Sequence, residues 1–263
     1  MIHHVTKGSG PTILLIHGFL GSHFSWRNQV GPLSGAGFRV IAVDLPGFGE
    51  SHQPWEADHS HTALADACAA LVRQLAAGPV HAVGHSMGGR VALWLALRHR
   101  ELVQSLTLVD PSVFSVPMKA LAKIPGALGL AKALLRKRWS RPDHFRSDLG
   151  SFYGTHQHYD VVADYWRRYR RPENQDGLLA HVRDSNGPSV EPHLASLRLP
   201  IQLIWGEKDN LFPLQQAHRL KALLPGADLA VVPGGDHFVP ESAPEQVNQI
   251  LLDFLIKRTA SRH

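Results

Sequence analysis

Cysteine is almost absent from this sequence. Cys68 is the single cysteine among 263 residues, so no disulfide bond can form within the chain. It stands in a run of small residues with helical composition, residues 65–70, where we expect a buried structural thiol. The stability of the fold must therefore come from a packed apolar core, and the chain is long enough to build one.

Long apolar runs are absent as well. Charged residues, proline or glycine interrupt every apolar run before it reaches the length that crosses a bilayer. Residues 1–11 are polar and lack the basic-then-apolar pattern of a secretory signal. These two absences predict a cytoplasmic protein.

The net charge of +5 is not spread over the chain. Residues 112–196 hold 13 Lys and Arg against 8 Asp and Glu, and the remainder is neutral. No binding motif or interleaved aromatic patch accompanies this charge, so nucleic acid is not an expected partner. The basic segment is either a solvated helical surface or a lid attracted weakly to anions or membranes.

Short apolar, β-branched runs alternate with helical stretches through much of the chain. This alternation predicts an α/β fold, a parallel sheet with helices on both faces. Burial of both faces explains why the strand-like runs are continuously apolar. We expect strands at residues 12–16, 38–43, 80–83, 102–109, 201–205 and 229–232, and helices at residues 61–76, 87–98, 214–224 and 244–257.

The alternation stops between Pro111 and about Leu197. This segment is helical, basic and aromatic in composition, and seven prolines divide it into short helices. Its length suits an inserted subdomain. We therefore predict a core formed by residues 1–111 and 197–263, interrupted by a helical cap, or lid, at residues 112–196.

The most informative string is GHSMGG, residues 84–89. It lies between a strand-like run and a helix-like run, where a sharp turn would expose the hydroxyl of Ser86. Glycine at positions 84 and 88 avoids collisions with the neighbouring strand and helix. The start of the helix supplies positive potential to a developing oxyanion. The pattern predicts that Ser86 is a nucleophile.

A serine nucleophile needs a base and an acid. Among 18 histidines, His237 lies in a loop after the last expected strand, at the edge where ligands collect in open α/β sheets. Two aspartates, Asp209 and Asp110, each follow an expected strand and lie at the same edge. We assign the acid to Asp209 and keep Asp110 as the alternative.

Two backbone N–H groups should stabilise the oxyanion of the reaction. One belongs to Met87, directly after the nucleophile. The other belongs to Phe19, in the loop HGFLG that follows the first expected strand.

As a set, these residues resemble the α/β-hydrolase superfamily. The resemblance implies an eight-stranded, mostly parallel sheet with a cap inserted after the sixth strand. Its motifs are, in chain order, residues 17–19, residues 44–51, residues 84–89, Asp209 and His237.

Within the superfamily, the loop from His17 to Trp26 is similar to that of epoxide hydrolases and haloalkane dehalogenases. Those families attack with an aspartate at the position of Ser86, so a serine there favours acyl transfer. We predict a serine hydrolase of the carboxylesterase type, acting on esters of small to medium apolar substrates through an acyl-enzyme.

Families with other activities resemble this chain about as well. Carbon–carbon bond hydrolases of aromatic degradation and cofactor-free perhydrolases share these features, and fold alone does not choose among them. A ligand receptor built on the same fold is the non-enzymatic alternative. The sequence shows no metal cluster or nucleotide-binding loop, so we expect no cofactor and no metal.

The cap should set the choice of substrate. We expect most of its aromatic residues in the cap core and some in an apolar pocket. The basic, leucine-rich stretch 119–138 is either an amphipathic helix over the site or a weak contact with a membrane surface. The expected substrate contacts are Phe19, Trp26, Phe114, Tyr153 and Phe238.

Overall fold

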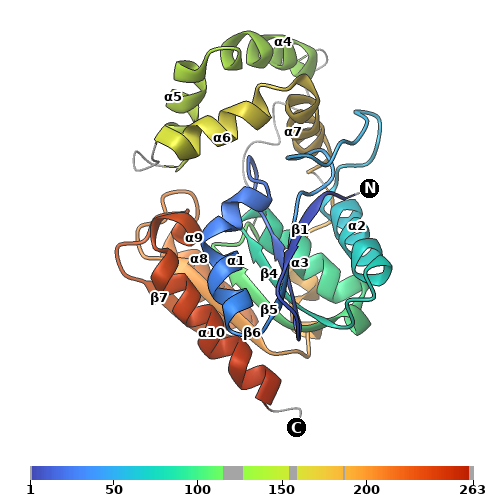
Figure 1. Ribbon diagram of the computed structural model, residues 1–263, viewed down its shortest axis with the longest axis vertical. Helices are drawn as coiled ribbons and strands as arrows, with labels where there is room; N and C mark the ends of the chain where they lie inside the picture. The colour runs from blue at the N-terminus through green and yellow to red at the C-terminus, as the bar shows by residue number, and fades with distance from the viewer. Residues whose placement is uncertain (1, 115–126, 154–158, 186, 261–263) are drawn as a thin grey trace.

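The computed structural model describes residues 2–114, 127–153, 159–185 and 187–260, and a seven-stranded sheet forms its centre (Figure 1). The strand order is β1-β3-β2-β4-β5-β6-β7, with β1 antiparallel to β3 and every other neighbouring pair parallel. The strands are β1 (His4–Lys7), β2 (Thr12–Ile16), β3 (Arg39–Val43), β4 (Val80–His85), β5 (Val103–Val109), β6 (Ile201–Gly206) and β7 (Asp228–Val232).

The central strands are buried on both faces. Every residue of β2, β4 and β6 is buried, as their largely apolar sequences predict. Leu14 of β2 pairs with Ile41 of β3 and with Ala82 of β4, which sets these three strands in parallel register. The carboxyl ends of the parallel strands therefore share one edge, and the loops that follow them meet there.

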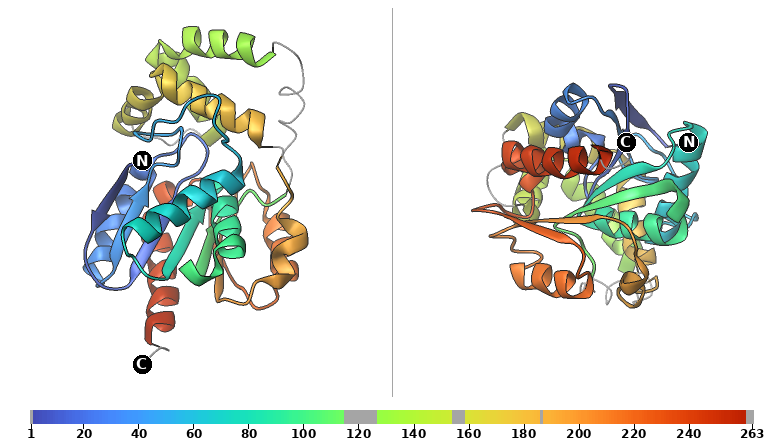
Figure 2. Two further views of the ribbon diagram at one scale, coloured as in Figure 1. Left: turned by 90° about the vertical axis from the view of Figure 1, so that its right-hand side faces the viewer. Right: turned by 90° about the horizontal axis from the view of Figure 1, so that it is seen from below.

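Helices cover both faces of the sheet (Figures 1 and 2). Alternate strand residues belong to separate apolar clusters: Ile13 and Leu15 pack on one side, and Leu14 and Ile16 on the other. On the first side lie α1 (Arg27–Gly35), α9 (Val239–Ser242) and α10 (Pro244–Ala260), and on the second lie α2 (His61–Gln74), α3 (Met87–Arg98) and α8 (Leu214–Leu223).

Cys68 lies in α2 and is buried, as expected. Burial raises the pKa of its thiol to about 12, because an apolar environment disfavours the thiolate. The thiol is therefore a packing group of the core.

Two features of the sheet differ from the expectation. The resemblance implied eight strands, whereas the sheet has seven among the described residues. Strand β1 itself escaped prediction because its sequence, HVTK, is polar and half-exposed at the sheet edge, so it lacks the apolar signal of the inner strands.

Between β5 and β6, the described residues form four α-helices that gather at one end of the molecule (Figures 1 and 2). Trp139, Phe145 and Tyr169 pack their rings together there, with centroid separations of 5.1 to 6.3 Å, and form a small aromatic core. The first part of the basic stretch, residues 119–126, lies outside the described residues. The four helices are α4 (Ala127–Trp139), α5 (Pro142–Tyr153), α6 (Tyr159–Tyr169) and α7 (Pro172–Asp184).

Hydrogen bonds tie this cap to the core. The Tyr169 hydroxyl donates to the carbonyl of Gly21 at 2.8 Å, and the Tyr165 hydroxyl donates to the carboxylate of Glu241 at 2.6 Å. The cap thus rests on the loop after β2 and on α9. Within the described part of the chain, none of the helices has the length and apolarity needed to cross a membrane.

The described residues also include three short 3-10 helices. They are η1 (His23–Trp26), η2 (Arg100–Leu102) and η4 (Glu191–Ser196). The first of them holds the loop after β2 in place, because Ser22 and Ser25 form a reciprocal capping box at its start.

Candidate active site

Ser86 lies at the turn between β4 and α3. Its backbone has φ 53° and ψ −118°, a strained conformation for a residue with a side chain. Backbone bonds fix the turn: Ser86 N–H donates to the Val109 carbonyl at 2.9 Å, and the Ser86 carbonyl accepts from Gly89 and Ser112 at 3.0 Å. The serine side chain is thereby held at the carboxyl edge of the sheet.

The flanking glycines are required by space. A Cβ on Gly84 would lie 2.3 Å from the carbonyl oxygen of Gly88, and a Cβ on Gly88 would lie 2.3 Å from the carbonyl oxygen of Ile16. Either contact is closer than atoms can approach, so any larger residue would displace α3 from the sheet. This agrees with the role predicted for these glycines from the sequence.

The structure brings Ser86, His237 and Asp209 together. The Ser86 hydroxyl lies 3.0 Å from His237 Nε2, across 151 positions of sequence. On the other side of the ring, His237 Nδ1 lies 2.7 Å from Asp209 Oδ2. With Nδ1–H donating to the carboxylate, Nε2 carries the lone pair and accepts the proton of the serine hydroxyl. All three side chains are buried.

Asp209 is held by its own loop. Its Oδ1 accepts the N–H groups of Leu211 and Phe212, both at 2.8 Å. This loop is joined to the loop of His237, because Lys208 N–H donates to the Gly235 carbonyl at 2.7 Å. The carboxylate and the imidazole are therefore placed by one connected piece of backbone.

Asp110, the alternative acid, is not the residue that contacts His237. It is fully buried at the end of β5, and its Oδ1 accepts the N–H of Gly206 at 2.8 Å. Burial, and next the charge of Asp209, raise the pKa of the Asp110 carboxyl well above its ordinary value.

His85 has a positioning role that the sequence did not reveal. Its Nε2–H donates to the backbone carbonyl of His237 at 2.8 Å, and the two rings lie 5.1 Å apart. Burial lowers the pKa of His85 to about 3, so its ring is neutral. Adjacency to Ser86 was the one signal in the sequence, and it does not show that the side chain reaches the base.

The loop after β2 lies against the nucleophile. A Cβ on Gly18 would lie 3.0 Å from Ser86 Cβ and from His85 Nδ1. His17 shapes this loop from inside: its Nδ1–H donates to the Gly18 carbonyl at 2.7 Å, and its Nε2 accepts the Leu45 N–H at 3.0 Å. The loop that continues into Phe19 therefore lies against Ser86 at Gly18, and Met87 follows the serine directly as the first residue of α3.

A family model described as "alpha/beta hydrolase fold" matches residues 11–244 of this sequence. The chain belongs to the α/β-hydrolase fold family.

Relatives of this α/β hydrolase carry several names. An uncharacterized hydrolase of Bacillus subtilis is 28% identical, over 96% of this chain and 92% of its own. A 2-hydroxy-6-oxononadienedioate/2-hydroxy-6-oxononatrienedioate hydrolase of Comamonas testosteroni is 27% identical, over 97% and 91%. Among solved structures, a thermophilic esterase from Thermogutta terrifontis aligns with a TM-score of 0.81 and 25% identity, over 98% and 93%.

Aromatic rings surround the imidazole of this α/β hydrolase. The Phe212 ring lies edge-on to His237 at 5.1 Å, and the Phe238 ring does so at 5.4 Å. Phe238 was predicted from the sequence, whereas Phe212 was not. Phe19 is partly buried, with its ring near Phe48 and His181.

The other predicted substrate contacts are placed differently. Trp26 is fully buried in the apolar cluster beneath α1 and α10, which favours a packing role. Phe114 is partly buried, with the guanidinium of Arg219 4.0 Å above its ring. Tyr153 ends α5, and its side chain lies outside what the structure describes.

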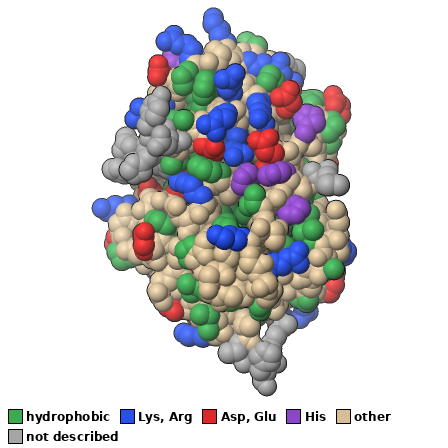
Figure 3. Space-filling view, in the orientation of Figure 1, with side chains coloured by type: hydrophobic (Ala, Val, Ile, Leu, Met, Phe, Trp, Pro, Cys, Tyr) green, Lys and Arg blue, Asp and Glu red, His purple; other side chains and the backbone are tan. Residues whose placement is uncertain are grey.

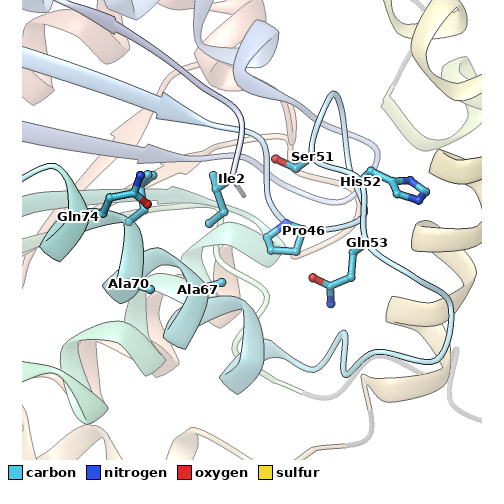
Figure 4. Close-up of a pocket in the computed structure, with 9 residues that line it drawn as sticks. Ile2, Pro46, Ser51, His52, Gln53, Ala67, Ala70 and Gln74 are labelled. Carbon is cyan, nitrogen blue, oxygen red and sulfur yellow. The ribbon is translucent and has the colours of Figure 1, made fainter.

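A pocket of about 240 Å³ lies away from these residues, between the loop after β3 and α2 (Figure 4). None of Ser86, Asp209 and His237 lines it. Its walls are Ile2, Pro46, Ser51, His52, Gln53, Ala67, Ala70, Leu71 and Gln74.

One group within residues 2–114 has the side chains of a metal site. The ligand atoms of His3, His23 and Asp44 lie within 4.8 Å of one another. Both imidazole Nδ1 atoms contact the Asp44 carboxylate at 2.9 Å, and that carboxylate also accepts the N–H groups of His23 and Glu50. These contacts compensate the burial of Asp44 and hold its pKa below the ordinary value.

Proposed function

We propose that this protein is a serine hydrolase that cleaves carboxylic esters of small to medium apolar substrates. One observation carries the proposal: the Ser86 hydroxyl lies 3.0 Å from His237 Nε2, while Asp209 binds the opposite nitrogen of the same ring. This is the geometry in which a serine becomes a nucleophile at neutral pH.

The first half of the reaction forms an acyl-enzyme. Ser86 Oγ attacks the ester carbonyl carbon as His237 Nε2 takes the hydroxyl proton. The resulting imidazolium is stabilised by Asp209, which stays ionised. The tetrahedral intermediate then expels the alcohol, to which His237 returns the proton.

The second half releases the acid. A water molecule gives a proton to His237 Nε2 and attacks the acyl carbon, and Ser86 Oγ leaves with that proton. We assign the stabilisation of both oxyanions to the backbone N–H groups of Phe19, in the loop after β2, and of Met87, the residue after the nucleophile. Loss of one such donor typically costs ~3 kcal/mol of transition-state stabilisation.

Two considerations favour esters, and a third favours apolar ones. The nucleophile is a serine, and an acyl-enzyme is the intermediate that serine forms. The Thermogutta terrifontis structure that aligns along nearly the whole chain is described as an esterase. The apolar rings of Phe212 and Phe238 beside His237 suit an apolar substrate.

Carbon–carbon bond hydrolysis is the second candidate. It is favoured by the Comamonas testosteroni relative, whose name describes a hydrolase of unsaturated keto-diacids. The same triad would serve, so the choice depends on the substrate pocket. A ratio of kcat/KM for vinylogous diketones over p-nitrophenyl esters far above one would favour this second activity. Perhydrolysis is tested in the same assays by adding hydrogen peroxide.

The test is the hydrolysis of p-nitrophenyl esters from acetyl to palmitoyl by the wild type and by Ser86→Ala. We expect the variant to lose about 10⁴-fold or more in kcat. Ser112→Ala, a serine in the adjoining loop, is the matched control and should keep its activity. Full activity of Ser86→Ala would remove Ser86 from the mechanism. Tight ligand binding without turnover by the wild type would favour a receptor instead.

A further inference from the structure

Three polar side chains from separate parts of the chain meet at the end of β3. The antiparallel ladder of β1 and β3 continues one position beyond the strands, because the Asp44 N–H donates to the His3 carbonyl at 2.9 Å. Residues opposite each other in such a ladder place their side chains on the same face of the sheet. His23 comes from the start of η1, where its N–H donates to Asp44 Oδ1 at 2.6 Å. The backbone therefore holds two imidazoles beside one carboxylate.

Both imidazole rings turn the same nitrogen toward Asp44. His3 Nδ1 lies 2.9 Å from Oδ2, and His23 Nδ1 lies 2.9 Å from Oδ1 and 3.0 Å from Oδ2. The ligand atoms of the three side chains all lie within 4.8 Å of one another. Two imidazole nitrogens and one carboxylate oxygen are a ligand set typical of Zn²⁺ sites that keep a position for water.

The Asp44 carboxylate is buried, and no Lys or Arg of the described residues pairs with it. Its ion-pair partners are the two imidazoles, which are charged only when protonated. The N–H groups of His23 and Glu50 each bind one of its oxygens and fix its orientation. The Glu50 carboxylate itself is bound by Arg168 and Arg171, so it is not a further ligand. The acceptor positions that remain on Asp44 face the two rings.

Solvent reaches this group from the side of the histidines. The side chain of His3 is 40% exposed and that of His23 is 17% exposed, whereas that of Asp44 is fully buried. A tetrahedral Zn²⁺ ion with bonds of about 2.0–2.2 Å separates its ligand atoms by about 3.3 Å. A small rotation of the exposed His3 ring therefore makes room for the ion, and water can complete its coordination.

We propose that His3, His23 and Asp44 form a binding site for a divalent transition-metal ion, Zn²⁺ in the first place. The ligands are both Nδ1 atoms and one carboxylate oxygen, with water in the remaining position. In the ion-bound state each neutral ring carries its proton on Nε2, which leaves the Nδ1 lone pair for the ion. The ion joins the segment before β1, the start of η1 and the end of β3, so it stabilises the folded state. The site contains no residue of the triad and does not depend on the proposed function.

The sequence gave no sign of this site. His3 is 41 positions from Asp44 and His23 is 21 positions from it, whereas zinc motifs are recognised by ligands a few residues apart. The pairing of β1 with β3 brings the ligands together, and β1 was itself not predicted.

Titration calorimetry with Zn²⁺ tests the site directly, on the full chain without a histidine tag and after removal of metal by EDTA. We expect one site per chain in the wild type, and binding at least about tenfold weaker in His3→Gln and in His23→Gln. Glutamine keeps an N–H donor for Asp44, so the hydrogen bond that supports the fold can persist. His4→Gln is the matched control, because this neighbouring ring contacts the Ile2 carbonyl instead, and its affinity should equal that of the wild type.

Wild-type binding weaker than about 1 mM would overturn the proposal. So would Zn²⁺ binding that both glutamine variants leave unchanged, since the ion would then be held by other histidines of the chain. If His23→Gln fails to fold, His3→Gln, whose side chain is the more exposed, still decides the question.

Thermal unfolding gives a second measurement. With free Zn²⁺ about 100-fold above Kd, the unfolding midpoint of the wild type and of His4→Gln should rise by about 5 °C, and that of His3→Gln should rise much less. An equal rise in all three proteins, or none in the wild type, would contradict the site. Ester hydrolysis enters neither measurement, so failure of the proposed function and failure of the metal site are distinguished.

Discussion

At the scale of single residues, three buried histidines are held neutral. Burial lowers the pKa of His17 to about 4, of His85 to about 3 and of His181 to about 4, all from 6.5. Each ring donates a hydrogen bond to a backbone carbonyl. The acceptor is Gly18 for His17, His237 for His85 and His59 for His181. The folded protein therefore resists binding protons that the unfolded chain accepts.

We expect the folded state to lose stability in mild acid. Below pH 6.5 the unfolded chain binds protons at these three positions, whereas the folded protein does not until its lowered pKa values are reached. The free energy of unfolding should fall as pH drops from about 6.5 to about 4, by up to about 1.4 kcal/mol per pH unit for each histidine.

Urea unfolding at a series of pH values measures this slope. His85→Gln keeps a side-chain N–H donor but does not titrate. Its unfolding free energy should therefore change less steeply with pH, by an amount equivalent to about one proton. Substitution of the exposed histidine His52 is the control and should leave the slope unchanged. Equal slopes for His85→Gln and the wild type would contradict the expectation.

The sequence predicted which residues could form the site, and it favoured Asp209 over Asp110 as the acid. Ser86, His237, Asp209 and Asp110 were found because each follows a strand, and parallel strands end at one edge. The position after a strand does not by itself separate the two aspartates. In the structure Asp209 is the one that contacts His237 Nδ1, at 2.7 Å, and this contact is set by loop geometry that composition and spacing do not reveal.

At the scale of elements, the most buried strands and helices were the ones that the sequence predicted best. The strands buried on both faces were predicted within one or two residues, as were α2, α3 and α8, and α10 extends three residues beyond its predicted end. Strand β1 and helix α1 were missed for physical reasons. β1 is polar at the sheet edge, and α1 contains Gly31, Pro32 and Gly35, which oppose helix formation until tertiary packing imposes it.

Helix α4 exposes two leucines next to basic residues. Leu130 is 64% exposed and Leu134 is 58% exposed, one helical turn apart on the same face. Figure 3 shows Lys and Arg side chains gathered on this upper part of the molecule. Arg136 and Arg138 are partly neutralised by Asp176 and Asp148.

We propose that this face makes a weak contact with anionic lipid surfaces, because apolar side chains can enter the headgroup region while basic ones attract it. Flotation with vesicles containing about 30% phosphatidylserine should recover more protein than flotation with neutral vesicles, and the difference should fade at high salt. The double variant Leu130→Gln, Leu134→Gln should bind vesicles less than the wild type. Ile256→Gln is the control, because it removes a comparably exposed apolar side chain from α10, and its binding should be unchanged. Equal recovery of all three proteins would argue for a merely solvated helix.

At the scale of the whole molecule, the cap is joined to the core through a buried polar contact. The Tyr165 hydroxyl donates to Glu241 at 2.6 Å and lies 2.8 Å from Ser25 Oγ, while Arg27 pairs with the same carboxylate at 2.6 Å. Burial raises the pKa of Glu241, so its charge depends on these partners. A sequence rule can predict an inserted cap, but it does not predict which side-chain contacts join the cap to the core.

Tyr165→Phe should weaken this junction. The variant leaves a buried carboxylate with one donor fewer, which costs about 1–3 kcal/mol in the free energy of unfolding. Tyr169→Phe loses only a bond to the neutral Gly21 carbonyl, and about 1 kcal/mol is expected. Chemical denaturation of the two variants makes the comparison, and a smaller loss for Tyr165→Phe than for Tyr169→Phe would show that the charged contact does not dominate.

The single cysteine in α2 has a practical consequence for measuring how the cap is placed on the core in solution. Because the Cys68 thiol is buried and resists ionisation, thiol-reactive maleimide dyes and nitroxide reagents should not label it in the native protein. A reporter can then be attached at one chosen place, such as a cysteine introduced on the outer face of α4, without first replacing a native residue. The distance between cap and core in solution is thereby open to fluorescence and spin-resonance measurement in an otherwise unaltered chain.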